Sequence, residues 1–281
     1  MVENRPFLTF MTHAIIILGL VIIVFPIYIA FVASTHATED LVTTVQPWFG
    51  NQLIENYSTV LTSGKQTAGG VPVSIMMWNS LIMAVGIVVG KIAISLISAF
   101  AIVYFRFRFR MTCFWMIFLT LMLPVEVRIL PTYKVVVDLG LLNTYAGLIL
   151  PLIASATATF LFRQFFLTVP DELAEAARVD GAGPMRFFLT ILLPLSRTNI
   201  AALAVILFIY GWNQYLWPLL ITTETNMTTI VMGIQRMLYV ADSVPEWNLT
   251  MATAILAMLP PVIVVLALQR QFVKGLVETE K

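Results

Sequence analysis

The segment PDELAEAARVDGAGPMRFFLTILLP, from Pro170 to Pro194, is a polar island between long hydrophobic stretches. It holds four of the fifteen acidic residues of the chain. Asp171 and Glu172 follow the proline, which predicts a helix start because proline suits the first turn and acids favour the positive end of the helix dipole. Gly181 then predicts a left-handed cap at the end of this helix.

A second short helix is expected to start near Pro184 and to end at Pro194, so the island is predicted to form an elbow of two helices. Spacings of four and three residues predict one charged face on the first helix, made by Asp171, Glu175 and Arg178. The residues expected on its narrow apolar face are Val169, Leu173, Ala176 and Ala177. From physics alone, the elbow is either a docking surface for another protein or an amphipathic loop lying on the membrane.

Composition indicates a membrane protein. Apolar residues make up 59% of the 281 residues and charged residues only 11%, against roughly 25% charged in an average soluble domain. A net charge of +1 offers no basic surface for a nucleic-acid partner. The single cysteine, Cys113, excludes a disulfide framework, and His13 and His36 lie far from other candidate ligands, so we expect neither a metal site nor a catalytic site.

A membrane-spanning helix needs about 20 mostly apolar residues, because every backbone polar group must be paired where water is absent. Six stretches qualify, at residues 14–33, 78–105, 114–136, 145–166, 199–221 and 251–268. The predicted fold is therefore all-α: one polytopic membrane domain over residues 1–281 with six transmembrane helices. Outer loops are expected at 34–77 and 222–250, and the elbow lies in a loop at 167–198. The first stretch lacks a cleavage site, so it is interpreted as a retained anchor.

The distribution of Lys and Arg predicts the orientation of the chain. On one side of the six-span arrangement lie eleven basic residues, namely Arg5, Arg106, Arg108, Arg110, Arg163, Arg178, Arg186, Arg197, Arg270, Lys274 and Lys281. Only three, Lys65, Lys134 and Arg236, lie on the other side. Basic loops face the cytoplasm, so both termini and the elbow are predicted to be cytoplasmic.

The elbow also carries a motif. Glu175-Ala176-Ala177, then Gly181, then Ile191-Leu192-Leu193-Pro194 resembles at every position the EAA signature of permease subunits in bacterial ATP-binding-cassette importers. The resemblance implies that the island is a coupling helix seated in a groove of a cytoplasmic ATPase. Glu175 would pair with a basic residue of that ATPase, and Gly181 would make the turn. The residues that it assigns to ATPase coupling are Glu175, Ala176, Ala177, Asp180, Gly181 and Pro194.

The six spans and two outer loops resemble the shorter permease subunit of carbohydrate and polyol importers. Five segments, at residues 98–101, 105–107, 114–118, 121–128 and 210–218, resemble more narrowly the permeases of glycerol-3-phosphate importers. Ser196 stands close behind the Leu-Pro pair, where many sugar relatives carry a proline. The resemblance implies translocation of sn-glycerol 3-phosphate or a related glycerophosphodiester by alternating access. A neutral sugar or polyol is the alternative solute.

The chain contains no G-x-x-x-x-G-K-[ST] loop, so it is not expected to bind ATP phosphates in the usual way. The resemblance implies four partners: a second, different permease subunit, an ATPase dimer that holds ATP and Mg, an extracytoplasmic solute-binding protein, and the lipid of the bacterial inner membrane. The outer loop from Thr222 to Asn248 resembles the segment that reaches into the binding protein in such importers.

Several polar residues interrupt the predicted spans. Glu126 and Arg128 follow a proline, and an unpaired charge at such a depth costs at least ~2.5 kcal/mol. Glu126 and Arg128 either pair as structural or gating elements or contact an anionic solute. The role of Lys91 is left undecided in the same way. Asn213 and Gln214 either line the translocation path or contact a facing subunit. A proton-coupled secondary transporter that uses Lys91, Glu126 or Arg128 as a relay is the remaining alternative.

Overall fold

The computed structural model describes residues 6–42, 44, 46–64, 70–120, 125–238 and 245–277. These ranges are helical and contain no strand, which confirms the all-α prediction. The longer helices are α1 (Pro6–Ala33), α2 (Leu53–Thr62), α3 (Val73–Tyr104), α4 (Arg110–Leu119), α5 (Val125–Asp138), α7 (Ala156–Thr168), α8 (Asp171–Val179), α11 (Arg197–Trp212), α13 (Ile230–Leu238) and α14 (Trp247–Val277). Shorter helical segments are η1 (Glu39–Leu41), α6 (Tyr145–Ile149), η4 (Leu150–Leu152), α9 (Pro184–Phe187), the π-helical η5 (Phe188–Leu192), α10 (Leu193–Leu195), α12 (Leu216–Ile221) and η6 (Thr225–Met227).

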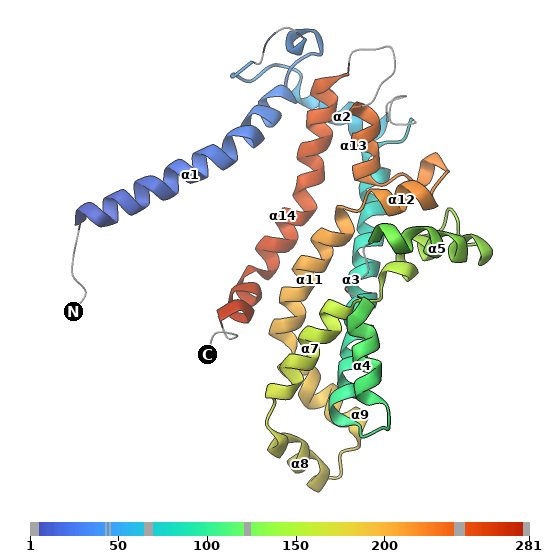
Figure 1. The fold of residues 1–281 in the computed structure, drawn as a ribbon. Coiled ribbons are helices and arrows are strands. Elements are labelled where there is room, and N and C mark those ends of the chain that lie inside the picture. Colours follow the sequence, from blue (N-terminus) through green and yellow to red (C-terminus); the bar gives the residue numbers. More distant parts are fainter. Residues whose placement is uncertain are drawn as a thin grey trace. The chain divides into compact units, whose positions relative to one another are not determined.

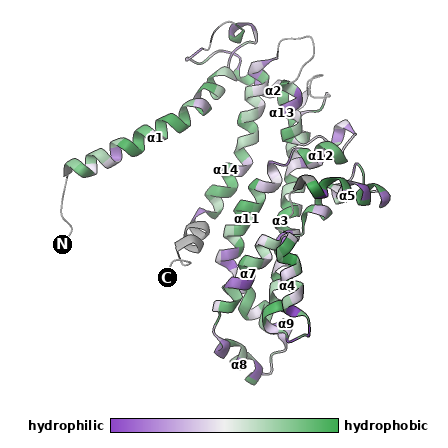
Figure 2. Cartoon of the chain, viewed as in Figure 1, coloured by the Kyte–Doolittle hydropathy of each residue, from purple (hydrophilic) through white to green (hydrophobic). Residues whose placement is uncertain are grey.

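Within the described ranges, three helices are continuous, apolar and long enough to cross a membrane: Phe7–Ala33, Val73–Tyr104 and Trp247–Gln269. They contain nearly all of the first, second and sixth predicted spans. Figure 2 shows hydrophobic residues along most of α1, α11 and α14, and hydrophilic residues on α8. The apolar surface of these helices is what a hydrocarbon environment requires.

The fourth predicted span is bent, and a second bend precedes the fifth. Tyr145–Leu152 and Ala156–Thr168 meet at 49°, and Pro184–Leu195 meets Arg197–Trp212 at 70°. Counting each bent pair as one span gives up to five spans by length and composition. The fifth helix also ends at Trp212 instead of continuing to Ile221. Pro218 explains this difference, since its ring would clash with the carbonyl of residue 214 in a continuous helix.

The third predicted span is interrupted. α4 ends at Leu119 and α5 begins at Val125, while residues 121–124 lie outside the described residues. α5 runs across α3 in Figure 1, whereas α4 runs along it. The predicted boundaries of this span and the count of six therefore stay predictions.

The chain divides into two compact units, Met1–Ile75 with Gly233–Leu259 and Met76–Met232 with Pro260–Lys281. In the first unit, a buried polar network joins the segment after α1 to α2 and to the start of α14. Asn56 donates to the carbonyl oxygens of Ser34 (2.9 Å) and His36 (2.8 Å) and accepts from Asn248 (3.1 Å). Thr38 donates to Asn248 (2.9 Å). Because its members are paired, the network can be buried without leaving an unsatisfied amide.

In the second unit, Asn79 ties α3 to two other segments. This side chain is 2% exposed and donates to the carbonyl oxygens of Asn226 (2.7 Å) and Thr228 (3.0 Å). It also accepts a hydrogen bond from the hydroxyl of Tyr145 (2.7 Å). α3, α6 and the loop around η6 are thus held together by one amide with three partners.

Glycine permits close approach of helices within this unit. A Cβ atom at Gly211 would lie 3.0 Å from the Cα of Ala84, and at Gly86 it would lie 2.5 Å from Cδ1 of Ile149. At Gly147 it would meet the carbonyl oxygen of Leu141, a backbone atom that cannot turn away. Helix α6 is therefore seated against the preceding loop by the absence of a side chain.

We predict that Gly147→Ala destabilises the protein by about 1–3 kcal/mol, because overpacking at this position must displace backbone. Thermal unfolding of the detergent-purified full-length chain measures the effect. Gly19→Ala is the matched control, since nothing lies within 4 Å of a Cβ atom at that helical position. Alanine is the better helix former, so the control should unfold at the same or a higher temperature. Equal melting temperatures for the two variants would contradict the packing argument.

Candidate functional site

The second unit contains an open-sided cavity of about 440 Å³ among α3, α4, α5, α7 and α11. It is lined by Lys91, Ile94, Ser98, Ile117, Thr120, Arg128, Ala154, Ser155, Ala156, Thr157, Thr159 and Tyr210. Hydroxyl groups and two cations supply the polar part of this lining. The structure thus brings together Lys91 and Arg128, which the sequence proposed for a translocation path.

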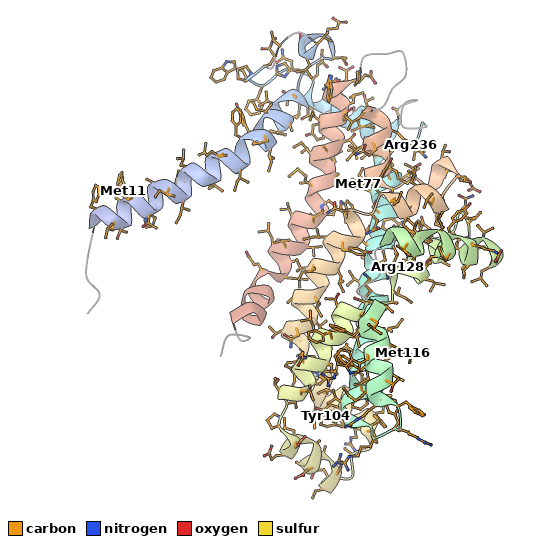
Figure 3. All side chains as sticks on the ribbon, in the orientation of Figure 1. Met11, Met77, Tyr104, Met116, Arg128 and Arg236 are labelled. Atoms are coloured by element: carbon orange, nitrogen blue, oxygen red, sulfur yellow. The ribbon has the colours of Figure 1, made fainter. Side chains whose placement is uncertain are left out.

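Lys91 is 8% exposed, and its Nζ atom lies 4.0 Å from the centre of the Tyr210 ring. This cation–π contact gives the buried ammonium a partner without neutralising its charge. Arg128 enters the same cavity from α5 (Figure 3). No carboxylate belongs to the lining formed by the described side chains, and that of Glu126 lies outside them.

The cavity adjoins the break in the fourth predicted span. Residues 153–155 are not helical, and α7 restarts at Ala156 with Ser155 as its cap, whose hydroxyl accepts from the amide of Ala158 (3.3 Å). The break is also tied to α3, since Ser95 donates to the carbonyl of Ser155 (3.3 Å). Four consecutive residues at the start of α7, 154–157, line the cavity. The positive end of the α7 dipole therefore lies at the cavity wall, where it favours negative charge.

Taken together, the cavity has a positive electrostatic character from two cations and one helix N-terminus. The hydroxyls of Ser98 and Thr157 can donate to an oxyanion, whereas those of Thr120 and Thr159 already donate to the carbonyls of Ile117 (2.6 Å) and Ser155 (2.9 Å). The geometry is suited to binding a small anion with several oxygen acceptors, and it holds no arrangement of nucleophile and base.

Two other predicted path residues do not line this cavity. Asn213 is exposed and caps the end of α11, and Gln214 donates to the carbonyl of Tyr210 (3.2 Å). Gln214 therefore supports the backbone behind Tyr210 instead of facing the cavity. Sequence reasoning missed Tyr210 and the hydroxyls of 155–159; the Ser-x-Thr-x-Thr alternation inside an apolar stretch was the available signal.

The elbow forms a second candidate site at one end of the second unit, where α8 lies beyond the ends of α7 and α4 (Figure 1). Gly181 has φ +71°, which confirms the predicted left-handed cap. The amide of Ala182 donates to the carbonyl of Ala177 (2.8 Å), and that of Gly181 to Arg178 (3.0 Å). These two bonds constitute a Schellman motif, which satisfies the last carbonyls of α8.

The charged face of α8 is confirmed, because Asp171, Glu175 and Arg178 are all exposed. The predicted apolar face is partly wrong. Ala174 and Ala177 are buried at 9% and 4% exposure, whereas Leu173 is 38% exposed and Ala176 is also exposed. The buried stripe is rotated from the predicted one, because Ala174 and Ala177 are the residues of α8 that belong to the buried cluster with Phe100 of α3 and Phe187 of α9.

The second elbow helix begins at Pro184 as predicted and continues through the π-helical segment to Leu195. Pro194 lies within α10, one residue before its end. Ser196 is fully buried at the 70° bend into α11, and its hydroxyl donates to the carbonyl of Leu192 (2.7 Å). A small hydroxyl residue thus pairs with the preceding turn at the bend.

Gly181→Ala is predicted to destabilise the elbow by about 1–2 kcal/mol, because a left-handed backbone is costly for a residue with a Cβ atom. Faster amide hydrogen exchange in residues 176–182 measures the loss. Gly183→Ala is the control, since Gly183 has φ −69° and its Cβ would also meet open space. Similar exchange in both variants would contradict a conformational role for Gly181.

The chain was compared with known proteins. The family model of the binding-protein-dependent transport system inner membrane component matches residues 91–278. The chain is 60% identical over 282 residues to the sn-glycerol-3-phosphate transport system permease protein UgpE of Rhizobium meliloti (strain 1021), with all of both chains covered. It is 58% identical over 284 residues to the protein of that name from Salmonella typhi, again over all of both chains.

Among solved structures, a bacterial ABC transporter involved in the import of the acidic polysaccharide alginate matches with a TM-score of 0.81. The match covers 97% of this chain and 99% of that one at 18% identity, so it speaks to the fold alone. The family match includes the cavity cations and the whole elbow. The chain belongs to the family of binding-protein-dependent transport system inner membrane components.

Proposed function

We propose that this chain is the permease subunit of an ATP-driven importer that translocates sn-glycerol 3-phosphate or a related glycerophosphodiester. The observation that carries the proposal is the cavity with Lys91, Arg128 and the α7 N-terminus, and no carboxylate among its described lining. Full-length relatives at 58–60% identity are named as sn-glycerol-3-phosphate permeases, which supports the same solute.

The positive charge of the cavity distinguishes between the two classes of solute, a glycerol phosphate and a neutral sugar or polyol. A phosphate monoester carries about −1.5 to −2 charges at pH 7, so it can satisfy both cations and the helix dipole at once. A neutral sugar would leave two cations in the membrane without a counter-charge, which is costly. A phosphorylated solute therefore fits this cavity better than a neutral sugar or polyol.

The resting contact of Lys91 suggests how solute is handled. Its ammonium lies over the Tyr210 ring of α11, and Arg128 lines the same cavity from α5. A phosphate bound between them would link α3, α5 and α11 through one anion. Alternating access would then move these helices around the anion, and separation of the two cations would release it.

Energy would come from another subunit. Glu175 on the exposed face of α8 would pair with a basic residue of a cytoplasmic ATPase dimer, which would hold ATP and Mg. A second, different permease would complete the path, and an extracytoplasmic binding protein would deliver the solute. In this proposal both termini lie on the cytoplasmic side of the inner membrane, as the distribution of basic residues predicts.

We predict that Lys91→Met and Arg128→Gln each reduce uptake of sn-glycerol 3-phosphate about tenfold or more, because a charge-assisted hydrogen bond contributes roughly 1.5–3 kcal/mol. Uptake of radiolabelled solute into proteoliposomes of the whole importer measures the effect. Lys134→Gln is the control, since Lys134 is an exposed cation on the same helix as Arg128 and does not line the cavity. Unchanged uptake in both cavity variants would refute the anion site.

Glu175→Ala is expected to abolish transport-linked ATP hydrolysis while leaving the folding of the chain intact, because the side chain is exposed. The control is Glu172→Ala, an equally exposed carboxylate on the same helix. ATPase activity of the reconstituted importer, with and without loaded binding protein, measures coupling. If Glu175→Ala hydrolyses ATP and transports normally, the docking role fails.

Co-purification in mild detergent tests the proposal as a whole. An ATPase and a second permease should be recovered with this chain, and the matching binding protein should bind sn-glycerol 3-phosphate in titration calorimetry. A binding protein that takes only a neutral sugar would overturn the solute assignment. Uptake that persists without ATP but collapses with the proton gradient would favour a secondary transporter.

A further inference from the structure

A second cavity of about 220 Å³ lies between the elbow and the end of α3. Its lining residues are Phe100, Tyr104, Phe105, Arg106, Ala174, Ala177, Arg178, Ala182, Pro184 and Phe187. It shares no lining residue with the larger cavity, so a role in solute translocation does not explain it.

The floor of this cavity is rigid and aromatic. The Tyr104 ring packs against Phe187 with centroids 5.2 Å apart and against Phe100 at 5.5 Å. Figure 3 shows Tyr104 at the end of the unit that carries the elbow. Ala174 and Ala177 form the α8 side, where small side chains keep the cavity open. This half of the cavity offers apolar surface to a hydrocarbon group.

The rim is cationic. Arg106 follows α3 and Arg178 projects from α8, so two separate elements each supply one exposed guanidinium. Within the part of the chain that the structure describes, no ion pair joins either arginine to a carboxylate. Guanidinium groups bind phosphate oxygens in a planar, two-pronged geometry. The rim is therefore suited to a phosphate group.

The position of the cavity selects among phosphate-bearing ligands. It lies at the end of α3, a helix of membrane-spanning length, beside Phe105, Phe107 and Phe109, which are 42%, 40% and 59% exposed. Exposed aromatic residues that alternate with arginines are typical of a membrane interface. A free phosphate ion would fill the rim and leave the aromatic floor empty, whereas a phospholipid has both a phosphate and an acyl chain.

We propose that this cavity binds an acidic phospholipid, with its phosphate between Arg106 and Arg178 and the beginning of an acyl chain against Tyr104 and Phe187. The lipid bridges the end of α3 and α8, two elements that the chain connects only through α4 to α7. It thereby fixes the elbow to the membrane interface. The inference is independent of the solute, since it uses none of the residues assigned to transport of the anion.

Native mass spectrometry of the full-length chain, titrated with phosphatidylglycerol or phosphatidylcholine, tests this site. We expect phosphatidylglycerol to bind the wild-type chain and each of Arg106→Gln and Arg178→Gln to weaken it roughly tenfold. Arg106→Lys should retain only part of the affinity, because the charge remains while the two-pronged geometry is lost. Arg108→Gln is the matched control: Arg108 is an exposed cation two residues from Arg106, outside the cavity lining.

Three outcomes would overturn the proposal. Equal weakening in Arg108→Gln would mean diffuse attraction to a basic surface. Displacement of the lipid by inorganic phosphate at about 10 mM would assign the rim to a small anion. Unchanged lipid binding in the two rim variants, together with loss of the co-purified ATPase, would make the cavity a protein contact. Thermal unfolding in neutral detergent verifies that each variant is folded before its lipid binding is compared.

Discussion

Backbone hydrogen bonding without water is the constraint on which this structure depends. A chain in hydrocarbon can leave the helix only where its freed amides and carbonyls find partners or line a polar cavity. The break at 153–155 meets this condition: its carbonyl at Ser155 accepts from Ser95 and Thr159, and its cap pairs with the amide of Ala158. These hydrogen bonds offset the free-energy cost of interrupting the helix. The same interruption creates the proposed site for an anion.

The same constraint shapes the elbow. α8 ends in a Schellman motif that satisfies its last carbonyls, and this requires the positive φ of Gly181. The bend into α11 is held by Ser196, whose hydroxyl pairs with the carbonyl of Leu192 in the preceding turn. In the proposed mechanism, a force applied to α8 would reach α11 through this elbow, and with it the cavity residue Tyr210 that α11 carries.

The ligand proposed for each pair of cations follows from the residues that surround the pair. Lys91 and Arg128 face a cavity beside a helix N-terminus, where an anionic solute would complete the charge balance. Arg106 and Arg178 face an aromatic floor at the end of α3, where the proposed ligand has an apolar part. Hydropathy alone cannot separate these two settings, because each residue is a charge next to apolar sequence. The two settings are distinguished by the side chains that neighbouring helices place around each cation.

Hydrophobic run length by itself determined the helical class and the location of the three continuous spans, since twenty apolar residues have one stable backbone state in a bilayer. Local chemistry likewise determined the start of α8 and the conformation of Gly181, because capping acts over a few residues. Only the tertiary structure decided that Lys91 and Arg128 meet, although 36 intervening positions separate them in sequence. It also decided which face of α8 is buried, where the fourth span bends and where the elbow turns into α11. Those features depend on side-chain packing between distant segments, and helical periodicity carries no information about which partner each face meets.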